Sequence, residues 1–265
     1  KPNLILDIDE TILHSKFDNN CIFITYRPGL FQFLENVSLS YNIYIYTAGT
    51  ETYAKCVVDD IKKYYKDIKF NNVLSRNHLL KENKYGDVYY TKCLYHFYKT
   101  IYSNSEMLEE VKDRIIREKV KKTIIIDNIS YNFYKQPNNG INIVDFYDDP
   151  YDRALYKLMR FLNVYTISEL DVDEYLPKNL NKLEGIIKQD YYMFYCNIPY
   201  DYIEIEIRED EFTNEDLDFW DISDDEEEPI INIDIKEIGI NINTNDDKLY
   251  MDNNKLVNNE ISGII

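Results

Sequence analysis

The sequence contains few of the residues that specify a disulfide-rich or membrane-spanning protein. Its 265 residues include only seven Gly, seven Pro, four Cys and one Trp. The cysteines are widely spaced and form no C-x-x-C pair, which fits reduced thiols of an intracellular protein better than a disulfide framework or a zinc site. No stretch reaches the roughly 18 apolar residues that a membrane-spanning helix needs. We therefore expect no membrane span and an intracellular location, either nuclear or cytoplasmic.

Basic side chains are scarce in the last quarter of the chain. Residues 1–200 carry 26 basic and 27 acidic side chains, whereas residues 201–265 carry 4 and 21. The formal net charge of -18 therefore belongs almost entirely to the C-terminal region. Because phosphates would be repelled there, we expect no direct binding of nucleic acid by this region, and we interpret it as a solvated segment with a basic protein as its possible partner. The chain begins at Lys1 without a methionine, which indicates a processed or trimmed product.

Short apolar runs alternate with helix-like segments through the first 163 residues. This alternation predicts an α/β, Rossmann-like domain over residues 1–163, with a central parallel sheet flanked by helices. The expected strands cover residues 3–8, 42–47, 123–127 and 141–146, and the expected helices cover residues 28–35, 51–65, 104–119 and 150–162. Residues 164–200 read as an α or mixed appendage. Residues 201–265 read as an acidic, Asn-rich and Ile-rich C-terminal region that is partly disordered.

The first predicted strand ends in two carboxylates. Residues 3–15 read NLILDIDETILHS, so an apolar run delivers Asp7 and Asp9 and is followed by Thr11. Ligands bind at the carboxyl ends of parallel strands, so two carboxylates spaced i and i+2 there can share one reaction centre. Asp7 can attack a phosphoryl group while Asp9 protonates the leaving oxygen and then activates water. We expect Thr11 to hydrogen-bond locally and hold the geometry of this loop.

Two more strand ends and one lysine complete the parts needed for phosphoryl transfer. Thr47 follows the second predicted strand, Asp127 and Asn128 end the third, and Lys92 lies between them in the sequence. Oxygen ligands at Asp7 and near Asp127 and Asn128 suit Mg²⁺, which would bridge an anionic nucleophile and an anionic phosphate. Lys92 would neutralise the phosphoryl oxygens, and the Thr47 hydroxyl would complete their coordination.

These motifs, in this order, resemble the FCP/SCP group of haloacid-dehalogenase-like (HAD) phosphatases, also called NLI-interacting-factor-like or CTD phosphatases. The resemblance covers residues 3–163 and rests on Leu-Asp-Ile-Asp-Glu-Thr-Ile-Leu-His-Ser, Arg-Pro-Gly at 27–29, Tyr-Thr-Ala-Gly at 46–49, Lys92 and Ile-Asp-Asn at 126–128. It implies a HAD fold without a large cap and a Mg²⁺-dependent phosphatase that acts on phosphoserine or phosphothreonine in a protein. Glu10 favours this reading, because small-molecule and polynucleotide phosphatases of the superfamily more often have Gly there.

The resemblance also implies a role for each residue of the catalytic pair and the metal site. Asp7 is the expected nucleophile, which forms an aspartyl-phosphate, and Asp9 is the expected general acid and base. Mg²⁺ is expected to be held by Asp7, the backbone carbonyl of Asp9 and Asn128. Asp127 would orient Lys92 or assist the metal.

The phosphate-binding residues implied by the resemblance are Thr47, Lys92 and, in Leu-Ser-Arg-Asn-His, Arg76. Two spacings depart from the family. Only residues 16–26 separate the first motif from Arg-Pro-Gly, fewer than in relatives that build a substrate-peptide pocket there. Conversely, Asp127 follows Lys92 by 35 positions, which indicates an added helix within residues 95–121 that could flank the cleft.

Two other functions stay open at this stage. The short first insertion also resembles the mitochondrial inner-membrane translocase receptor of this fold. A catalytically weak or inactive scaffold protein that recruits a basic partner through its acidic tail is therefore one alternative. Retention of both Asp7 and Asp9 argues against it, because adjacent carboxylates repel each other without a metal. The second alternative is a phosphatase of small metabolites or nucleic-acid ends. Glu10 and the lack of an evident cap disfavour this function.

Overall fold

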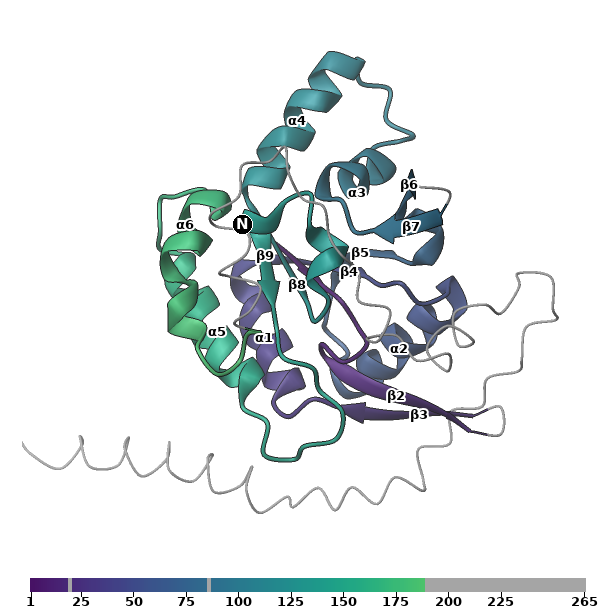
Figure 1. Cartoon of the computed structure of the whole chain (residues 1–265), viewed down its shortest axis with the longest axis vertical. Coiled ribbons are helices and arrows are strands. Elements are labelled where there is room, and N and C mark those ends of the chain that lie inside the picture. The colour runs from purple at the N-terminus through teal and green to yellow at the C-terminus, as the bar shows by residue number, and fades with distance from the viewer. Residues whose placement is uncertain (19–20, 85–86, 189–265) are drawn as a thin grey trace, which may run out of the picture. The chain divides into compact units, whose positions relative to one another are not determined.

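The computed structural model describes residues 1–18, 21–84 and 87–188, and a five-stranded parallel sheet forms the centre of this part (Figure 1). The strand order is β5-β4-β1-β8-β9. The strands are β1 (Asn3–Leu6), β4 (Asn42–Tyr46), β5 (Phe70–Leu74), β8 (Thr123–Asp127) and β9 (Gly140–Asn142). The parallel α/β architecture predicted from the sequence is confirmed. The last expected strand is shorter than predicted, because β9 ends at Asn142 instead of residue 146.

Strand β5 was not predicted from the sequence. Its residues read Phe-Asn-Asn-Val-Leu, and two adjacent asparagines weaken the pattern that identifies a strand. The segment nevertheless pairs in parallel with β4, across an irregularity in register between Ile43 and Tyr44. Pairing at the edge of an existing sheet therefore overrides the weak local propensity.

Helices connect the strands and cover the sheet. They are α1 (Leu30–Ser40), α2 (Glu51–Tyr64), α3 (Leu94–Ile101), α4 (Glu109–Lys121), α5 (Ala154–Tyr165) and α6 (Val172–Asn179), with short 3-10 helices η1 (Arg76–His78), η2 (Ser130–Phe133), η3 (Pro137–Asn139) and η4 (Leu180–Leu183). Three expected helices begin later than predicted, at Leu30, Glu109 and Ala154. The added helix expected within residues 95–121 corresponds to two helices, α3 and α4.

One face of the sheet packs against α3 and α4. Ile5 of β1 lies in register with Tyr44 of β4 and Ile125 of β8, so the three side chains share a face. They form one buried cluster with Phe97 of α3 and Ile116 of α4. Figure 1 shows α3 on one side of the sheet and α1, α5 and α6 on the other. Coverage of both faces explains why hydrophobic residues fill the interior of the central strands.

The register of the sheet places the predicted catalytic residues side by side. Leu6 of β1 is paired with Ile45 of β4 and with Ile126 of β8. Asp7 and Asp127 are the next residues on neighbouring parallel strands, so they lie together at the carboxyl end of the sheet. This is the edge where open α/β sheets bind ligands.

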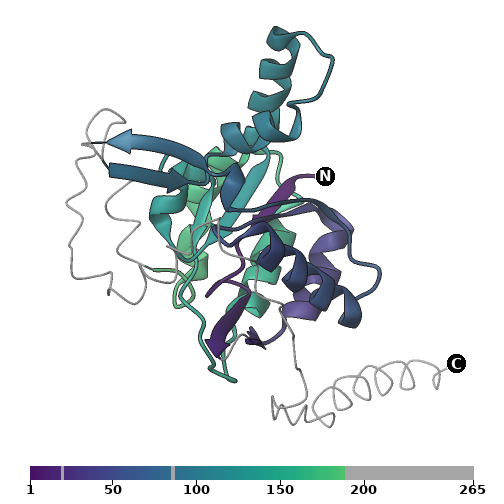
Figure 2. The same cartoon turned by 90° about the vertical axis from the view of Figure 1, so that its right-hand side faces the viewer.

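The described residues outside 17–23 belong to one compact unit. Strands β2 (Leu13–Asp18) and β3 (Cys21–Tyr26) form a two-stranded sheet. Strands β6 (Leu80–Lys84) and β7 (Asp87–Thr91) form an antiparallel pair that projects as a separate ribbon in Figure 2.

The predicted appendage over residues 164–200 is described as far as residue 188 and contains α6 and η4. The acidic region, residues 201–265, lies outside the described residues, as does its expected docking role. Among the helices of the described ranges, none combines the length and the apolar character that crossing a membrane requires.

Gly140 at the start of β9 is expected to tolerate no larger side chain. A Cβ atom at this position would lie 1.9 Å from Cε2 of the Phe133 ring, which is completely buried. We expect Gly140→Ala to lower the free energy of unfolding by about 1–3 kcal/mol through overpacking. Urea denaturation measures this change. Gly140→Ala should lower the free energy of unfolding less when Phe133 is already changed to Leu than when it is added to the unchanged chain. Strictly additive losses in the double variant would contradict the proposed clash.

Candidate active site

Lys92 forms ion pairs with both Asp7 and Asp127. Its Nζ lies 2.5 Å from Asp7 Oδ1 and 2.6 Å from Asp127 Oδ2. The exposed fractions of Asp7, Lys92 and Asp127 are 6%, 1% and 0%. The backbone of Lys92 is held as well, because its N–H donates to the Asn132 carbonyl and its carbonyl accepts from Gln136 Nε2. The structure thus brings together three residues that are far apart in the sequence and that the sequence singled out.

Asp7 and Asp127 share a single ammonium group in this buried cluster. Burial and the neighbouring Asp127 raise the pKa of the Asp7 carboxyl to about 8, and Lys92 partly opposes this rise. Burial acts to lower the pKa of Lys92, but Asp127 and Asp7 outweigh it and raise that pKa. One ammonium therefore faces two carboxylates in a buried site. An additional positive charge next to Asp7 would favour its ionised form.

Asp127 is fully occupied by hydrogen bonds. Its Oδ1 accepts from the Ile129 N–H at 2.8 Å and from Asn132 Nδ2 at 3.0 Å. Its Oδ2 accepts from Lys92 and, at 3.0 Å, again from Asn132 Nδ2. Asp127 is therefore arranged to hold Lys92 in place. Sequence reasoning missed Asn132, because an asparagine five residues after a strand end carries no distinguishing signal.

Thr11 links the first aspartate to Asn128. Its hydroxyl lies 3.4 Å from Asp7 Oδ2 and 3.3 Å from Asn128 Oδ1, and it accepts from the Asn128 N–H at 3.1 Å. Asn128 Nδ2 donates to Asp145 Oδ1 at 2.8 Å, which fixes the amide orientation. The amide oxygen of Asn128 is therefore turned toward the same hydroxyl as Asp7 Oδ2.

The oxygens around Thr11 fit a hard divalent cation. Among the described residues, no group of three or more His, Cys, Asp or Glu side chains is arranged as a metal site. The oxygens that the structure brings to Thr11 are one carboxylate oxygen, from Asp7, and one amide oxygen, from Asn128. Oxygen donors with few protein ligands are what Mg²⁺ prefers, since it retains several waters.

Asp9 is held by two hydroxyl groups. Its Oδ1 accepts a hydrogen bond from Ser15 Oγ at 3.0 Å and another from the Tyr53 hydroxyl. Burial raises the pKa of Asp9, while the hydrogen bonds from Tyr53 and Ser15 act to lower it. Sequence reasoning missed both partners. Ser15 ends the first motif and could have been suspected, whereas nothing in the sequence connects Tyr53 to Asp9.

Thr47 and Arg76 belong to a second group, built on the loop after β4. Thr47 is completely buried, and its Oγ1 accepts from the Gly49 N–H at 2.9 Å. Arg76 Nε donates to the Ala48 carbonyl at 2.8 Å, and the Arg76 N–H donates to the Gly49 carbonyl. This loop follows the strand next to β1 in the sheet, so the two groups border the same edge.

Glu10 has an unusual backbone conformation. Its φ of 52° lies in the left-handed region, where glycine is the least strained residue. Its carboxylate lies 2.8 Å from Nδ1 of His14. Glu10 thus adopts, between Asp9 and Thr11, a backbone conformation that glycine would adopt with less strain, and its side chain pairs with His14 in the same loop.

A buried arginine stabilises the loop that carries Asp9, Glu10 and Thr11, which we call the catalytic loop. The Arg27 side chain is completely buried, and its Nη1 donates to the Thr11 carbonyl at 2.9 Å. Nε and Nη2 bind the two carboxylate oxygens of Asp152 at 3.0 and 2.8 Å. Asp152 also accepts from the N–H of Ala154, the first residue of α5. The ion pair therefore connects the catalytic loop to the start of α5.

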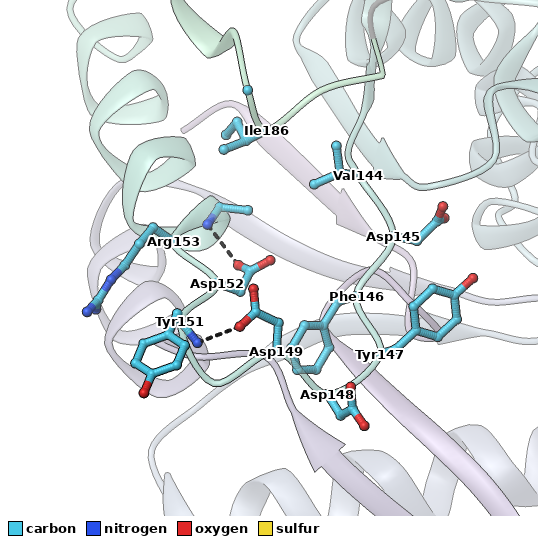
Figure 3. Close-up of a pocket in the computed structure, with 12 residues that line it drawn as sticks. Val144, Asp145, Phe146, Tyr147, Asp148, Asp149, Tyr151, Asp152, Arg153 and Ile186 are labelled. Carbon is cyan, nitrogen blue, oxygen red and sulfur yellow. Dashed lines mark hydrogen bonds between the residues drawn. The ribbon is translucent and has the colours of Figure 1, made fainter.

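A cavity of about 450 Å³ lies beside this pair. Figure 3 shows its acidic lining, of which Asp149 accepts from the Tyr151 N–H and Asp145 is the residue that orients Asn128. Asp145 Oδ1 also accepts from Lys188 Nζ at 2.8 Å, and Asp152 binds Arg27 and the start of α5. These contacts assign the carboxylates structural roles.

The sequence is similar to a known family and to several known proteins. A family model described as NLI interacting factor-like phosphatase matches residues 2–173. CTD small phosphatase-like protein 2 of Dictyostelium discoideum is 28% identical over 205 residues, which cover 71% of this chain and 31% of that protein. CTD nuclear envelope phosphatase 1B of Danio rerio is 26% identical over 204 residues, which cover 68% of this chain and 72% of that protein. The chain thus spans less than a third of the length of the first relative.

A solved structure of Fcp1, described as an essential RNA polymerase II CTD phosphatase, is also similar. It superimposes with a TM-score of 0.48 and 18% sequence identity, and the match covers 69% of this chain and 71% of that one.

Proposed function

The chain belongs to the NLI interacting factor-like phosphatase family, and from this premise we propose that it is a Mg²⁺-dependent protein serine/threonine phosphatase with an aspartyl-phosphate intermediate. The family resemblance read from the motifs is confirmed. The observation that carries the proposed mechanism is the position of Lys92 Nζ, 2.5 Å from Asp7 Oδ1 and anchored by Asp127. A phosphoryl group attacked by Asp7 would lie within reach of this ammonium.

In the first step Asp7 is the nucleophile and Asp9 is the acid. A carboxylate oxygen of Asp7 forms a bond to phosphorus while the bond from phosphorus to the serine or threonine oxygen breaks. Asp9 gives its proton to that leaving oxygen. Lys92 and the loop of Thr47 and Arg76 stabilise the charge on the phosphoryl oxygens.

In the second step the acyl-phosphate is hydrolysed. Asp9, now ionised, accepts a proton from a water molecule, whose oxygen forms the new bond to phosphorus. The bond between phosphorus and Asp7 then breaks, which releases inorganic phosphate and restores both carboxyl groups to their initial forms. Asp9 is suited to both steps because its side chain is only partly buried and follows Asp7 by two residues.

Asp7, the backbone carbonyl of Asp9 and Asn128 are the residues that we assign to hold Mg²⁺. When bound, the ion would supply positive charge that lowers the repulsion between the anionic Asp7 carboxylate and the anionic phosphoryl group. We assign Asp127 to the orientation of Lys92, because its four accepted hydrogen bonds already occupy both of its oxygens.

The proposed substrates are phosphoserine and phosphothreonine in proteins, as the resemblance of the motifs implies. The matching family is described as a phosphatase, which supports the type of reaction. One relative is named for the nuclear envelope, so nuclear phosphoproteins are the first candidates.

A phosphopeptide assay tests this proposal. The full chain is incubated with peptides that carry phosphoserine, phosphothreonine or phosphotyrosine, and with small sugar phosphates, in Mg²⁺ or in excess chelator. We expect phosphate release from the first two peptides in Mg²⁺ and at least about a tenfold loss in chelator. Release only from the sugar phosphates would favour the metabolite phosphatase considered above. A complete lack of turnover would favour the scaffold protein.

A further inference from the structure

We infer that Tyr53 and Ser15 are positioning residues for Asp9: they occupy its Oδ1 and thereby leave Oδ2 as the oxygen that exchanges a proton with the leaving group. This inference rests on the proposed phosphatase function. Both hydroxyl groups donate to the same carboxylate oxygen, Tyr53 directly from α2 and Ser15 from β2. A carboxylate oxygen has two lone pairs in its plane, so two donors satisfy it.

The fold holds Tyr53 firmly in this position. Tyr53 lies in the first turn of α2, where its N–H donates to the side chain of the capping residue Thr50 at 3.2 Å. Its ring lies against Gly49, where an added Cβ would come within 2.5 Å of Cδ1 of the ring. Only 7% of Tyr53 is exposed. Thus the loop with Thr47 and Gly49, at the proposed phosphate site, also sets the position of the ring.

The Tyr53 hydroxyl has one proton to donate, and it is directed to Asp9 Oδ1. The Ser15 hydroxyl lies 3.2 Å from the Tyr53 oxygen, so the three polar groups form one compact triangle. Because both donors come from elements outside the turn that carries Asp9, they restrict rotation of its carboxyl group.

The chemical consequence concerns the first step of the reaction. As the bond from phosphorus to the leaving oxygen breaks, the proton on Asp9 Oδ2 must reach that oxygen. A carboxyl group that rotates freely presents this proton in the correct direction for only part of the time. Fixing Oδ1 therefore assists poor leaving groups, such as the serine alkoxide, more than good leaving groups that need little protonation.

The test is the dependence of kcat/KM on leaving-group pKa. Aryl phosphates from p-nitrophenyl to unsubstituted phenyl phosphate are compared for the unchanged chain, Tyr53→Phe and Ser15→Ala, because kcat/KM reports the step in which the aryl group leaves. We expect Tyr53→Phe to lower kcat/KM by about tenfold or more for phenyl phosphate and much less for p-nitrophenyl phosphate. Ser15→Ala should change the slope of log kcat/KM against leaving-group pKa in the same direction.

Tyr41→Phe is the matched control. Tyr41 is 2% exposed and its hydroxyl donates to the Leu162 carbonyl, so this variant also loses one buried hydrogen bond. Its slope should equal that of the unchanged chain. An equal loss for all leaving groups in Tyr53→Phe, or no loss, would overturn the inference. Absence of Mg²⁺-dependent turnover in the unchanged chain would instead remove the proposed function on which the inference rests.

Discussion

Asp7→Asn is expected to lower kcat for aryl phosphate hydrolysis by about four orders of magnitude or more, because one substitution removes the nucleophile and a metal ligand together. The amide of asparagine cannot form the acyl-phosphate. The fold should survive, since the side chains have similar volumes and Lys92 keeps its ion pair with Asp127 at 2.6 Å. Steady-state turnover of p-nitrophenyl phosphate in saturating Mg²⁺ measures the loss.

Asp59→Asn is the matched control for this experiment. Asp59 lies on the exposed side of α2, so the same change of charge there should leave kcat unaltered. A turnover by Asp7→Asn within about tenfold of the unchanged chain would remove Asp7 from the role of nucleophile.

Arg27→Met is expected to lower the free energy of unfolding by about 3–5 kcal/mol, because it leaves the Asp152 carboxylate without its charged partner in a largely buried place. The exposed fractions of the Arg27 and Asp152 side chains are 0% and 11%. The variant also removes a hydrogen bond to the Thr11 carbonyl, so the catalytic loop should loosen together with the start of α5. Urea denaturation gives the change in free energy.

Two companion variants make this result specific. Arg117→Met removes an arginine whose side chain is 69% exposed and whose partner is Asp113, so it should change stability little. The double variant of Arg27→Met with Asp152→Asn should be less unstable than the sum of the single variants. If Arg27→Met lowered the free energy of unfolding no more than Arg117→Met, the buried pair would not stabilise the fold as its geometry indicates.

The strands that carry the candidate site were predictable because their signals are local. Runs such as Thr123–Asp127 are apolar up to a terminal carboxylate, and in a parallel sheet buried on both faces such runs identify the strands. Parallel strand ends meet at one edge, so the proximity of Asp7 and Asp127 followed from the pattern. The roles assigned to these residues stay predictions until the variants are measured.

Other parts of the fold had no such local signal. Strand β5, with two asparagines in five residues, depends on pairing with β4, and no propensity reveals that partner. The pair β6 and β7 is likewise defined by contacts between its strands. The left-handed backbone of Glu10 could not be predicted either, because it is a property of the folded loop and glutamate rarely adopts this conformation.

The sequence by itself determined the class of fold, the order of the motifs along the chain and the chemical type of each candidate side chain. Periodicity and residue chemistry are properties of short segments, so they can be read without coordinates. Only the tertiary structure decided which groups hold those side chains: Asn132 on Asp127, Tyr53 and Ser15 on Asp9, and Arg27 with Asp152 behind the loop. These contacts join segments by packing and orientation in three dimensions, and spacing along a chain does not encode them.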